Sequence, residues 1–310
     1  MKTFLKLIST LLLIASCRGN VPVDTSKLKI VTPVGAPAYA FYNYAKVERF
    51  ETNALPKNIV AMMSESSDKD IVVIDTTSGI QAINNGAPYK LAATVTFGNF
   101  YIASTGNDND GILNKGDSIV LFNKGGIPDV LFHYLYGNDF DEQIEYVAAV
   151  NNAAACLSGT NVATGNKVDY VFLAEPVLTV QLKTYSNAKI YADIQDEFKK
   201  KTDGKEMIQA SLFIKNSVDT KIANQFLKDL ETSINEAIED SSKIGTALDG
   251  MSDEEIKNKM GAPAAIAMAV TKKNNGLGLG YKNAYENKTN IDNFVKLFNI
   301  NETSEEIYFK

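Results

Sequence analysis

The chain has 310 residues, 45% of them hydrophobic, and a formal net charge of -6 from 31 basic and 37 acidic side chains. This length and composition are enough to bury the cores of two α/β lobes. The acidic balance and the lack of a basic cluster in the sequence argue against nucleic acid as a partner, because nucleic-acid-binding proteins neutralise phosphates with Lys and Arg.

The first residues, MKTFLKLISTLLLIASC, have the layout of a bacterial export signal. Two lysines precede an apolar run that is too short for a permanent membrane helix, so residues 1–16 are expected to be a signal peptide. Ala15 and Ser16 lead directly into Cys17, which resembles a lipobox and implies a lipidated N-terminus followed by a tether over 17–27. An ordinary secretory signal that is cut nearby is the alternative.

Acylation of Cys17 would hold the protein at the extracytoplasmic face of a bacterial membrane. Each buried CH₂ contributes roughly 0.8 kcal/mol, so two or more long acyl chains form a stable anchor. Loss of the signal removes Lys2 and Lys6 from the 31 basic side chains, so 29 remain against 37 acidic ones and the formal charge becomes -8. Cys156 would then have no intramolecular partner, and we expect it to be a buried small hydrophobic residue.

The first third of the mature chain predicts alternating strands and helices. Strands are expected over 28–32, 71–74, 90–94 and 99–105, with a strand or helix end at 59–64. The turn PVGAP precedes an aromatic helix expected over 38–50, and Pro37 suits its first position because proline lacks only an N–H that would be unpaired there. A loop of small hydroxyls at 75–78 leads into a short helix that ends at Asn84-Asn85-Gly86.

The middle of the chain repeats this order of elements. After Thr105 a polar, glycine-bearing segment is typical of a crossing between lobes. A strand over 118–122, a glycine loop at 123–127 and a helix begun by Pro128 follow. Two helix N-termini, one in each lobe, are therefore expected to face a common cleft with free N–H groups.

The remaining chain predicts further crossovers and a helical end. Strands are expected over 144–150, 168–173 and 189–193, with helices to about 164 and over 177–185 and 195–201, a spacing that predicts right-handed parallel crossovers. A strand over 207–215 is expected to return to the first lobe. Beyond it the sequence contains an apolar stripe, a capping box and an amphipathic helix: Ile222, Phe226, Leu230, Ile234 and Ile238; Ser252 with Glu255; and residues 290–299.

Several of these stretches resemble the solute-binding proteins of bacterial ABC importers, in the branch grouped with nitrate, sulfonate and thiamine-pyrimidine binders. The stretches are VTPVGAPAYAFY (31–42), NNGAPYKLAATVTFGNFYIAST (84–105), GGIPDVLFHYL (125–135), KVDYVFLAEPVLTVQL (167–182) and DIQDEFKKKTDGKEMIQASLFIK (193–215). The tail beyond about residue 245 matches weakly.

The resemblance implies an α/β, two-lobed fold like that of type II periplasmic binding proteins. Two mainly parallel sheets flanked by helices would be joined by two crossing segments, near 105–116 and 203–207. Lobe I would comprise 28–105 and 206–310, and lobe II would comprise 106–205.

The resemblance also implies a function. A monomer would trap a small-molecule ligand between its lobes by hinge closure, without a cofactor or metal, and deliver it to a membrane permease powered by a cytoplasmic ATPase. In this family the ligand contacts lie in loops after strands, at positions that match Gly35, Ala36, Pro37, Thr76, Thr77, Ser78, Thr96, Phe97, Asn99, Gly125, Gly126, Asn151 and Glu175.

The identity of the ligand does not follow from these positions. Glu175 at a strand end could accept hydrogen bonds from a ligand amine or ring N–H, which would disfavour a bare oxyanion, or it could brace the hinge. The glycine-proline helix starts favour an anionic or strongly hydrogen-bonding group, so a zwitterion or a heterocycle with donors and acceptors would satisfy both. Tyr39 and Phe97 could stack on such a ring or belong to the core. The residues from Thr76 to Ser78 could merely cap a helix.

An enzyme is not expected. His133 is the only histidine and lies in a helix predicted to be packed, and the sequence has no metal-ligand cluster, GxSxG elbow or Walker sequence. The alternative to transport is a surface lipoprotein that senses a ligand or binds another protein. Genes for a permease and an ATPase beside this one would favour transport.

Overall fold

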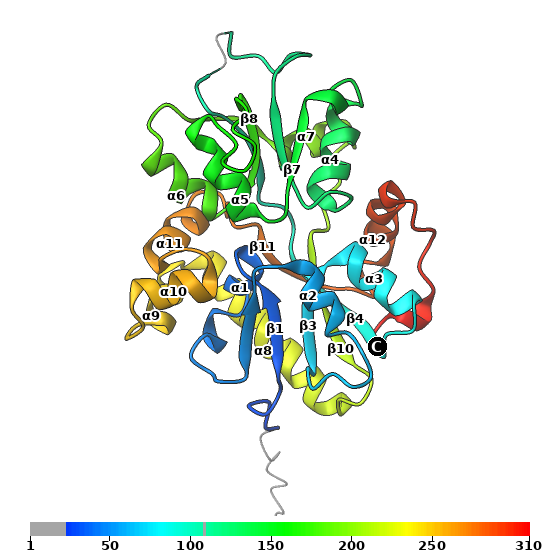
Figure 1. Cartoon of the computed structure of the whole chain (residues 1–310). Helices are drawn as coiled ribbons and strands as arrows, with labels where there is room; N and C mark the ends of the chain where they lie inside the picture. The colour runs from blue at the N-terminus through cyan, green and yellow to red at the C-terminus, as the bar shows by residue number, and fades with distance from the viewer. Residues whose placement is uncertain (1–22, 108–109) are drawn as a thin grey trace, which may run out of the picture.

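The computed structural model describes residues 23–107 and 110–310, which form two α/β lobes (Figure 1). Lobe I is the part built on a six-stranded sheet and lobe II the part built on a five-stranded sheet. The expected α/β class with two sheets flanked by helices is confirmed. The expected signal peptide and Cys17 lie outside the described residues, as does most of the expected tether.

The sheet of lobe I is mixed and buried on both faces. β1 is parallel to β2 and β3, and the other neighbouring pairs are antiparallel. Ile71 and Val73 of β3 pack into one hydrophobic cluster, and Val72 and Ile74 pack into another, which explains the unbroken apolar run. The order of the strands is β11 (Leu279–Asn283), β4 (Tyr89–Thr96), β10 (Ala210–Lys215), β3 (Ile71–Asp75), β1 (Ile30–Pro33) and β2 (Phe50–Asn53).

The sheet of lobe II is also mixed. β6 is parallel to β7 and β8, whereas β5 is antiparallel to β8 and β9. The strands expected to be joined by parallel crossovers, β7, β8 and β9, all run in the same direction, because β7 and β8 are each parallel to β6 while β8 and β9 are each antiparallel to β5. The order is β7 (Ile144–Val147), β6 (Ile119–Phe122), β8 (Tyr170–Ala174), β5 (Phe100–Ser104) and β9 (Lys189–Asp193).

Helices cover both faces of each sheet (Figure 1). Those of lobe I are α1 (Ala36–Tyr39), α2 (Pro56–Ala61), α3 (Thr76–Asn84), α8 (Thr220–Glu239), α9 (Ser242–Leu248), α10 (Asp253–Met260), α11 (Ala264–Lys272) and α12 (Lys288–Val295). Those of lobe II are α4 (Ile127–Tyr136), α5 (Val150–Ala155), α6 (Val177–Thr184) and α7 (Ile194–Lys201). No helix in the described ranges combines the length and the apolar character needed to cross a membrane.

The chain crosses between the lobes at 97–99 and again at 202–209, and we call these the first and second crossing segments. The first differs from the crossing expected near 105–116, because β5 belongs to lobe II. Its residues pair antiparallel with β8, from Phe100 opposite Ala174 to Ser104 opposite Tyr170. Lobe I therefore ends about eight residues earlier than the expected boundary at residue 105.

The single aromatic helix expected over 38–50 is wrong. α1 ends at Tyr39, a 3₁₀ turn occupies Tyr42–Tyr44, and β2 begins at Phe50. Aromatic side chains lose rotamer freedom in a helix, which disfavours a long aromatic helix. In this segment the free energy gained by burying the rings outweighs helix formation. Tyr39 and Phe41 are completely buried, so both rings belong to the core.

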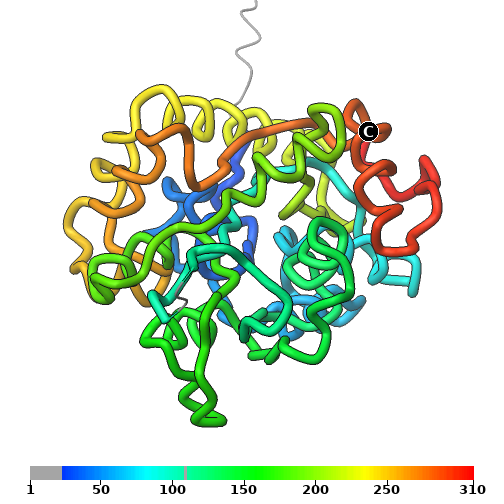
Figure 2. The backbone as a smooth tube through the Cα atoms, turned by 90° about the horizontal axis from the view of Figure 1, so that it is seen from above, coloured from blue at the N-terminus to red at the C-terminus, as the bar shows by residue number. Residues whose placement is uncertain are grey.

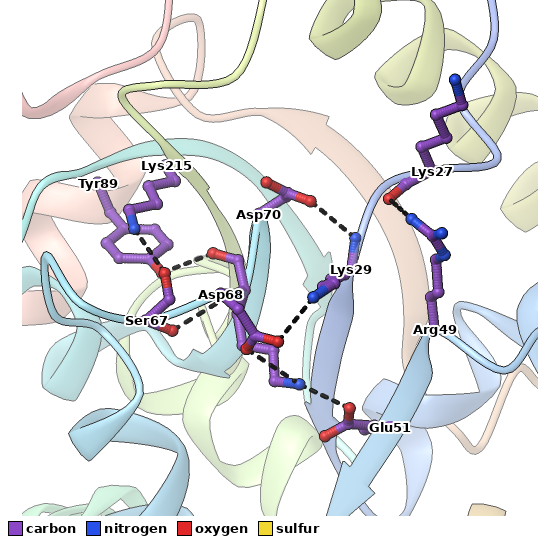
Figure 3. Close-up of polar contacts among 10 residues, drawn as sticks. Lys27, Lys29, Arg49, Glu51, Ser67, Asp68, Asp70, Tyr89 and Lys215 are labelled. Atoms are coloured by element: carbon purple, nitrogen blue, oxygen red, sulfur yellow. Dashed lines mark hydrogen bonds and ion pairs between the residues drawn. The ribbon is translucent and has the colours of Figure 1, made fainter.

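The start of β1 is fixed by polar contacts (Figure 3). The N–H of Lys29 donates to Asp70 Oδ2 at 2.9 Å, and Lys29 Nζ lies 2.8 Å from Asp68 Oδ2. Arg49 Nη1 donates to the carbonyl of Lys27 at 2.9 Å. These contacts tie the point where the chain enters lobe I to the loop before β3 and to the start of β2.

The lobes also touch on both flanks of the crossing segments. On one flank the rings of Phe198 in α7 and Phe294 in α12 have centroids 5.9 Å apart. On the other, Val180 of α6 packs against the core of lobe I near α11. Seen from above, the red C-terminal part and the yellow-to-orange helices lie at opposite sides of the molecule (Figure 2). The lobes are therefore braced at both sides of the space between them.

The apolar stripe of α8 yields a test of the core. Phe226 is completely buried, with its ring centroid 6.4 Å from that of Phe41 and 5.6 Å from that of Tyr44. Phe226→Ala should lower the free energy of unfolding by about 3 to 5 kcal/mol, because the lost ring leaves a cavity. Urea denaturation measures this loss, and the exposed Lys228→Ala on the same helix should change stability by at most about 0.5 kcal/mol. A loss below about 1 kcal/mol for Phe226→Ala would contradict this packing.

Candidate functional site

A cavity of about 120 Å³ lies between the lobes. We call it the interlobe cavity. The carboxyl ends of four strands reach it: Pro33 of β1, Asp75 of β3, Phe122 of β6 and Ala174 of β8. Open α/β sheets bind small molecules at this end of their strands, so the cavity lies where the topology places a ligand site.

The N-termini of α1 and α4 face this cavity from opposite lobes, as expected. Gly35, Ala36 and Pro37 line it from lobe I, and Ile127 and Pro128 line it from lobe II. Gly35 has φ +111°, a conformation that an L side chain rarely adopts, and this lets the chain turn sharply from β1 into α1. The repeated glycine-proline pattern therefore marks two matching walls of one cavity.

Two further predicted residues, Asn99 and Glu175, also line the interlobe cavity. The other eight do not. Phe97 instead lines a larger hollow of about 910 Å³ beside the crossing segments, where Lys282 Nζ lies 5.3 Å from its ring centroid. Asn151 is exposed on α5. Gly125 donates its N–H to Asp129 Oδ2 at 2.7 Å, and Gly126 is the N-cap of α4.

The predicted threonines and serine have structural partners. Asp75 Oδ1 accepts the N–H of Ser78 and the hydroxyl of Thr77, each at 2.8 Å, so these residues form the cap of α3. The hydroxyl of Thr76 lies 2.7 Å from that of Ser211. Thr96 accepts the N–H of Ala210 at 3.1 Å. The side chain that caps α3 is thus that of Asp75, with Thr77 and Ser78 as donors to it, and the hydroxyl of Thr76 takes no part in the cap.

Two residues of the cavity wall, Asn123 and Gln209, were not among the predicted contacts. Asn123 follows β6 directly and has a positive φ of +58°, which Asn adopts more readily than most residues. Gln209 is a polar residue just before the apolar strand β10. A polar side chain at that point in MIQASLFIK was the signal that could have identified it.

Asn99 joins both crossing segments to lobe II. Its Nδ2 donates to the carbonyl of Glu175 at 2.8 Å, and its Oδ1 accepts from Nε2 of Gln209 at 2.8 Å. The N–H of Glu175 donates in turn to the carbonyl of Asn99 at 2.9 Å. Asn99 is 1% exposed, so these bonds are shielded from water, and each contributes roughly 0.5 to 1.5 kcal/mol.

Glu175 presents a buried carboxyl group to the cavity and to the start of α6. Its two oxygens accept the N–H of Thr179 at 3.0 Å and the hydroxyl of Thr179 at 2.7 Å. Burial raises the pKa of this carboxyl above its usual range, although both bonds from Thr179 and the charge of Lys273 oppose the rise.

The electrostatics of the cavity are acidic. Carboxylates lie at the starts of α3, α4 and α6: Asp75 is the N-cap of α3, Asp129 lies in the first turn of α4, and Glu175 accepts the N–H of Thr179 in α6. Asp75 and Glu175 line the cavity, whereas no Lys, Arg or His does so within the described residues. A carboxylate at a helix N-terminus offsets its partial positive charge, so the starts of α3, α4 and α6 offer little to an anion, whereas α1 begins without an acidic residue in its first turn.

Two aromatic candidates have structural roles. Tyr39 is completely buried and donates its hydroxyl to the carbonyl of Ala262 at 2.5 Å, so it belongs to the core. His133 contacts the backbone carbonyl of Asp129 at 2.8 Å and Asp141 Oδ1 at 2.9 Å. Across residues 23–107 and 110–310, no group of three or more His, Cys, Asp or Glu is placed to hold a metal ion.

A comparison with protein-family models finds no match, and a comparison with curated proteins finds none either. Solved structures do resemble this chain. An ABC transporter protein from Parabacteroides distasonis matches with a TM-score of 0.67 and 18% identity, covering 93% of this chain and 99% of that one. The zinc-bound ligand-binding component of an ABC-type import system from Staphylococcus aureus matches with a TM-score of 0.62 and 11% identity, covering 91% and 96%.

The periplasmic aliphatic sulphonate binding protein of Escherichia coli matches with a TM-score of 0.59 and 12% identity, covering 87% of this chain and 86% of that one. At such identities the likeness concerns the fold. The chain therefore has the two-lobed fold of periplasmic binding proteins.

The buried carboxyl of Glu175 makes stability depend on pH. A folded pKa above the unfolded value means that the folded state resists ionisation, so stability falls as pH rises between the two values. The free energy of unfolding of the parent should therefore fall relative to that of Glu175→Gln as the pH rises from 4 to 8. Each tenfold change in proton affinity corresponds to about 1.4 kcal/mol. A difference between the two proteins that stays constant in urea titrations over this range would contradict the assignment.

Proposed function

We propose that the protein is an extracytoplasmic solute-binding lipoprotein of an ABC importer. The observation that carries the proposal is a cavity whose walls come from both lobes, at the carboxyl ends of their strands and beside the two crossing segments. Solved proteins described as components of ABC transport share the fold and are matched along nearly their whole length. Their ligands are not carried over to this chain.

The ligand that fits best is a small organic molecule with a nitrogen donor and no negative charge. Apolar residues such as Val34, Ile74, Phe100 and Val177 make up most of the cavity wall. The polar side chains among them are carboxylates, which accept hydrogen bonds from N–H groups, and amides, which both accept and donate hydrogen bonds. A nitrate or a simple sulfonate would meet carboxylates of like charge without a cationic partner in the wall, and this would weaken its binding.

Capture would couple to movement of the lobes. A ligand that touches both walls only when they approach each other shifts the equilibrium between open and closed forms by its binding free energy. The crossing segments are the points about which such a movement would occur. The contacts between Phe198 and Phe294 on one flank would have to adjust when the lobes separate.

A panel of metabolites screened by thermal denaturation tests this function. A ligand at one hundred times its dissociation constant stabilises the protein by about 2.7 kcal/mol. For a chain of this size the melting temperature should rise by roughly 5 to 10 °C. Amines and nitrogen heterocycles should produce the rise. Tight binding of nitrate or a simple sulfonate, with amines inert, would refute the proposed ligand class.

The membrane anchor has its own test. Expressed in a bacterium that processes lipoproteins, the parent should sediment with the membranes because of acyl chains on Cys17. Cys17→Ser should move the protein to the soluble fraction or leave the signal uncut. If the variant is processed and held by the membrane as firmly as the parent, the anchor is not at Cys17.

A further inference from the structure

We propose that Gln209 determines specificity by accepting an N–H group of the ligand through its side-chain Oε1. The ligand class that follows is a molecule with about one ring and an uncharged or cationic N–H donor. This inference rests on the proposed function, since it names the group that the same cavity recognises. Gln209 lies in the second crossing segment, so the residue that would recognise the ligand also belongs to a connection between the lobes.

The orientation of the Gln209 amide follows from a chain of hydrogen bonds. The backbone carbonyl of Glu175 can only accept, so Asn99 must present Nδ2 to it, at 2.8 Å. Asn99 Oδ1 then faces the other way and must meet a donor, which is Gln209 Nε2 at 2.8 Å. Gln209 Oε1 is then the one atom in this series of hydrogen bonds that is left without a partner. Among the described residues it has no hydrogen-bond partner.

An unpartnered carbonyl oxygen at this place is costly. Gln209 is only 8% exposed and its Oε1 is buried, so solvent does not satisfy it. A buried acceptor without a donor carries a desolvation penalty that a ligand N–H at the cavity wall would remove. A ligand of the same shape without an N–H would leave the penalty in place. The cavity therefore discriminates by the presence of a donor rather than by shape alone.

The backbone holds Gln209 firmly at the cavity wall. Its N–H donates to the carbonyl of Thr96 at 3.1 Å, and its carbonyl accepts the N–H of Thr76 at 3.0 Å. The two threonines, which were predicted as ligand contacts, thus position Gln209 instead. A side chain fixed at both its backbone and its amide loses little further entropy when a ligand binds.

The size and charge of the cavity limit what can reach this oxygen. An engineered cavity of about 150 Å³ in another protein accommodates benzene. The interlobe cavity, at about 120 Å³, is of similar size and therefore suits a ligand with one six-membered ring. Asp75 and Glu175 in the same wall disfavour a carboxylate or sulfonate on that ring. An amide, amidine or ring N–H would meet an acceptor at Gln209 and favourable charge around it.

Four isosteric probes test the inference: benzamidine, benzamide, acetophenone and benzoate. Benzamide and acetophenone differ in the N–H donor, benzamidine and benzamide differ in positive charge, and benzoate lacks the donor and carries a negative charge. In NMR titrations of the full chain, benzamidine and benzamide should bind about tenfold more tightly than acetophenone and benzoate. Acetophenone or benzoate binding as tightly as benzamide would overturn the inference, and this comparison needs no variant.

Two matched variants assign the preference to Gln209. Gln209→Met keeps the length of the side chain but removes the acceptor, so the benzamide-to-acetophenone ratio of affinities should fall to about one. The control Gln195→Met makes the same change in α7, at a glutamine whose Oε1 already accepts the N–H of Phe100 at 2.9 Å. In this variant the benzamide-to-acetophenone ratio of affinities should stay as in the parent. A ratio that survives in a folded Gln209→Met would overturn the assignment.

The test separates the two proposals. If the protein prefers benzoate, and Ala149→Phe in the cavity wall abolishes benzoate binding, the proposed role of Gln209 is wrong. The proposed function of solute binding would still hold. If none of the four probes and no member of the metabolite panel binds, the proposed function falls together with the inference.

Discussion

The hydrogen bonds of Asn99 join the two crossing segments and the end of β8 at one point between the lobes. This buried side chain stands where the chain first passes from lobe I to lobe II, and it binds the second crossing segment at Gln209 and the end of β8 at Glu175. Because its amide has one donor end and one acceptor end, and both are engaged, it fixes the orientation of its neighbours. Three of the polar residues that line the cavity, Asn99, Glu175 and Gln209, are joined at this one junction.

The charge of the cavity follows from how its surrounding helices begin. Carboxylates lie at the starts of three helices, where Asp75 caps α3, Asp129 stands in the first turn of α4, and Glu175 just precedes α6. The carboxylates of Asp75 and Glu175 accept helix N–H groups that an anionic ligand would need, whereas Asp129 accepts the N–H of Gly125, which precedes α4. The ligand class proposed for this chain therefore differs from the sulphonate named for a structural neighbour with the same fold.

The sequence predicted features set by local pattern and missed those set by distant partners. The apolar run of β3, the stripe of α8 and the capping box at Ser252 needed only periodicity and spacing, and the structure contains them. The lobe to which residues 100–104 belong depends on pairing with β8, some seventy residues away in the chain. Gln209 could not be recognised because its orphaned oxygen arises from a bond to Asn99, which lies 110 residues earlier.

The central claim is that a ligand binds between the lobes and contacts both of them. Hydrogen–deuterium exchange with the tightest binder from the metabolite panel tests it most directly, because exchange reports each lobe separately. Peptides covering Gly35–Ala38 in lobe I and Asn123–Val130 in lobe II should both exchange more slowly when the ligand is bound. Slower exchange in one lobe alone, with the other unchanged, would contradict the account.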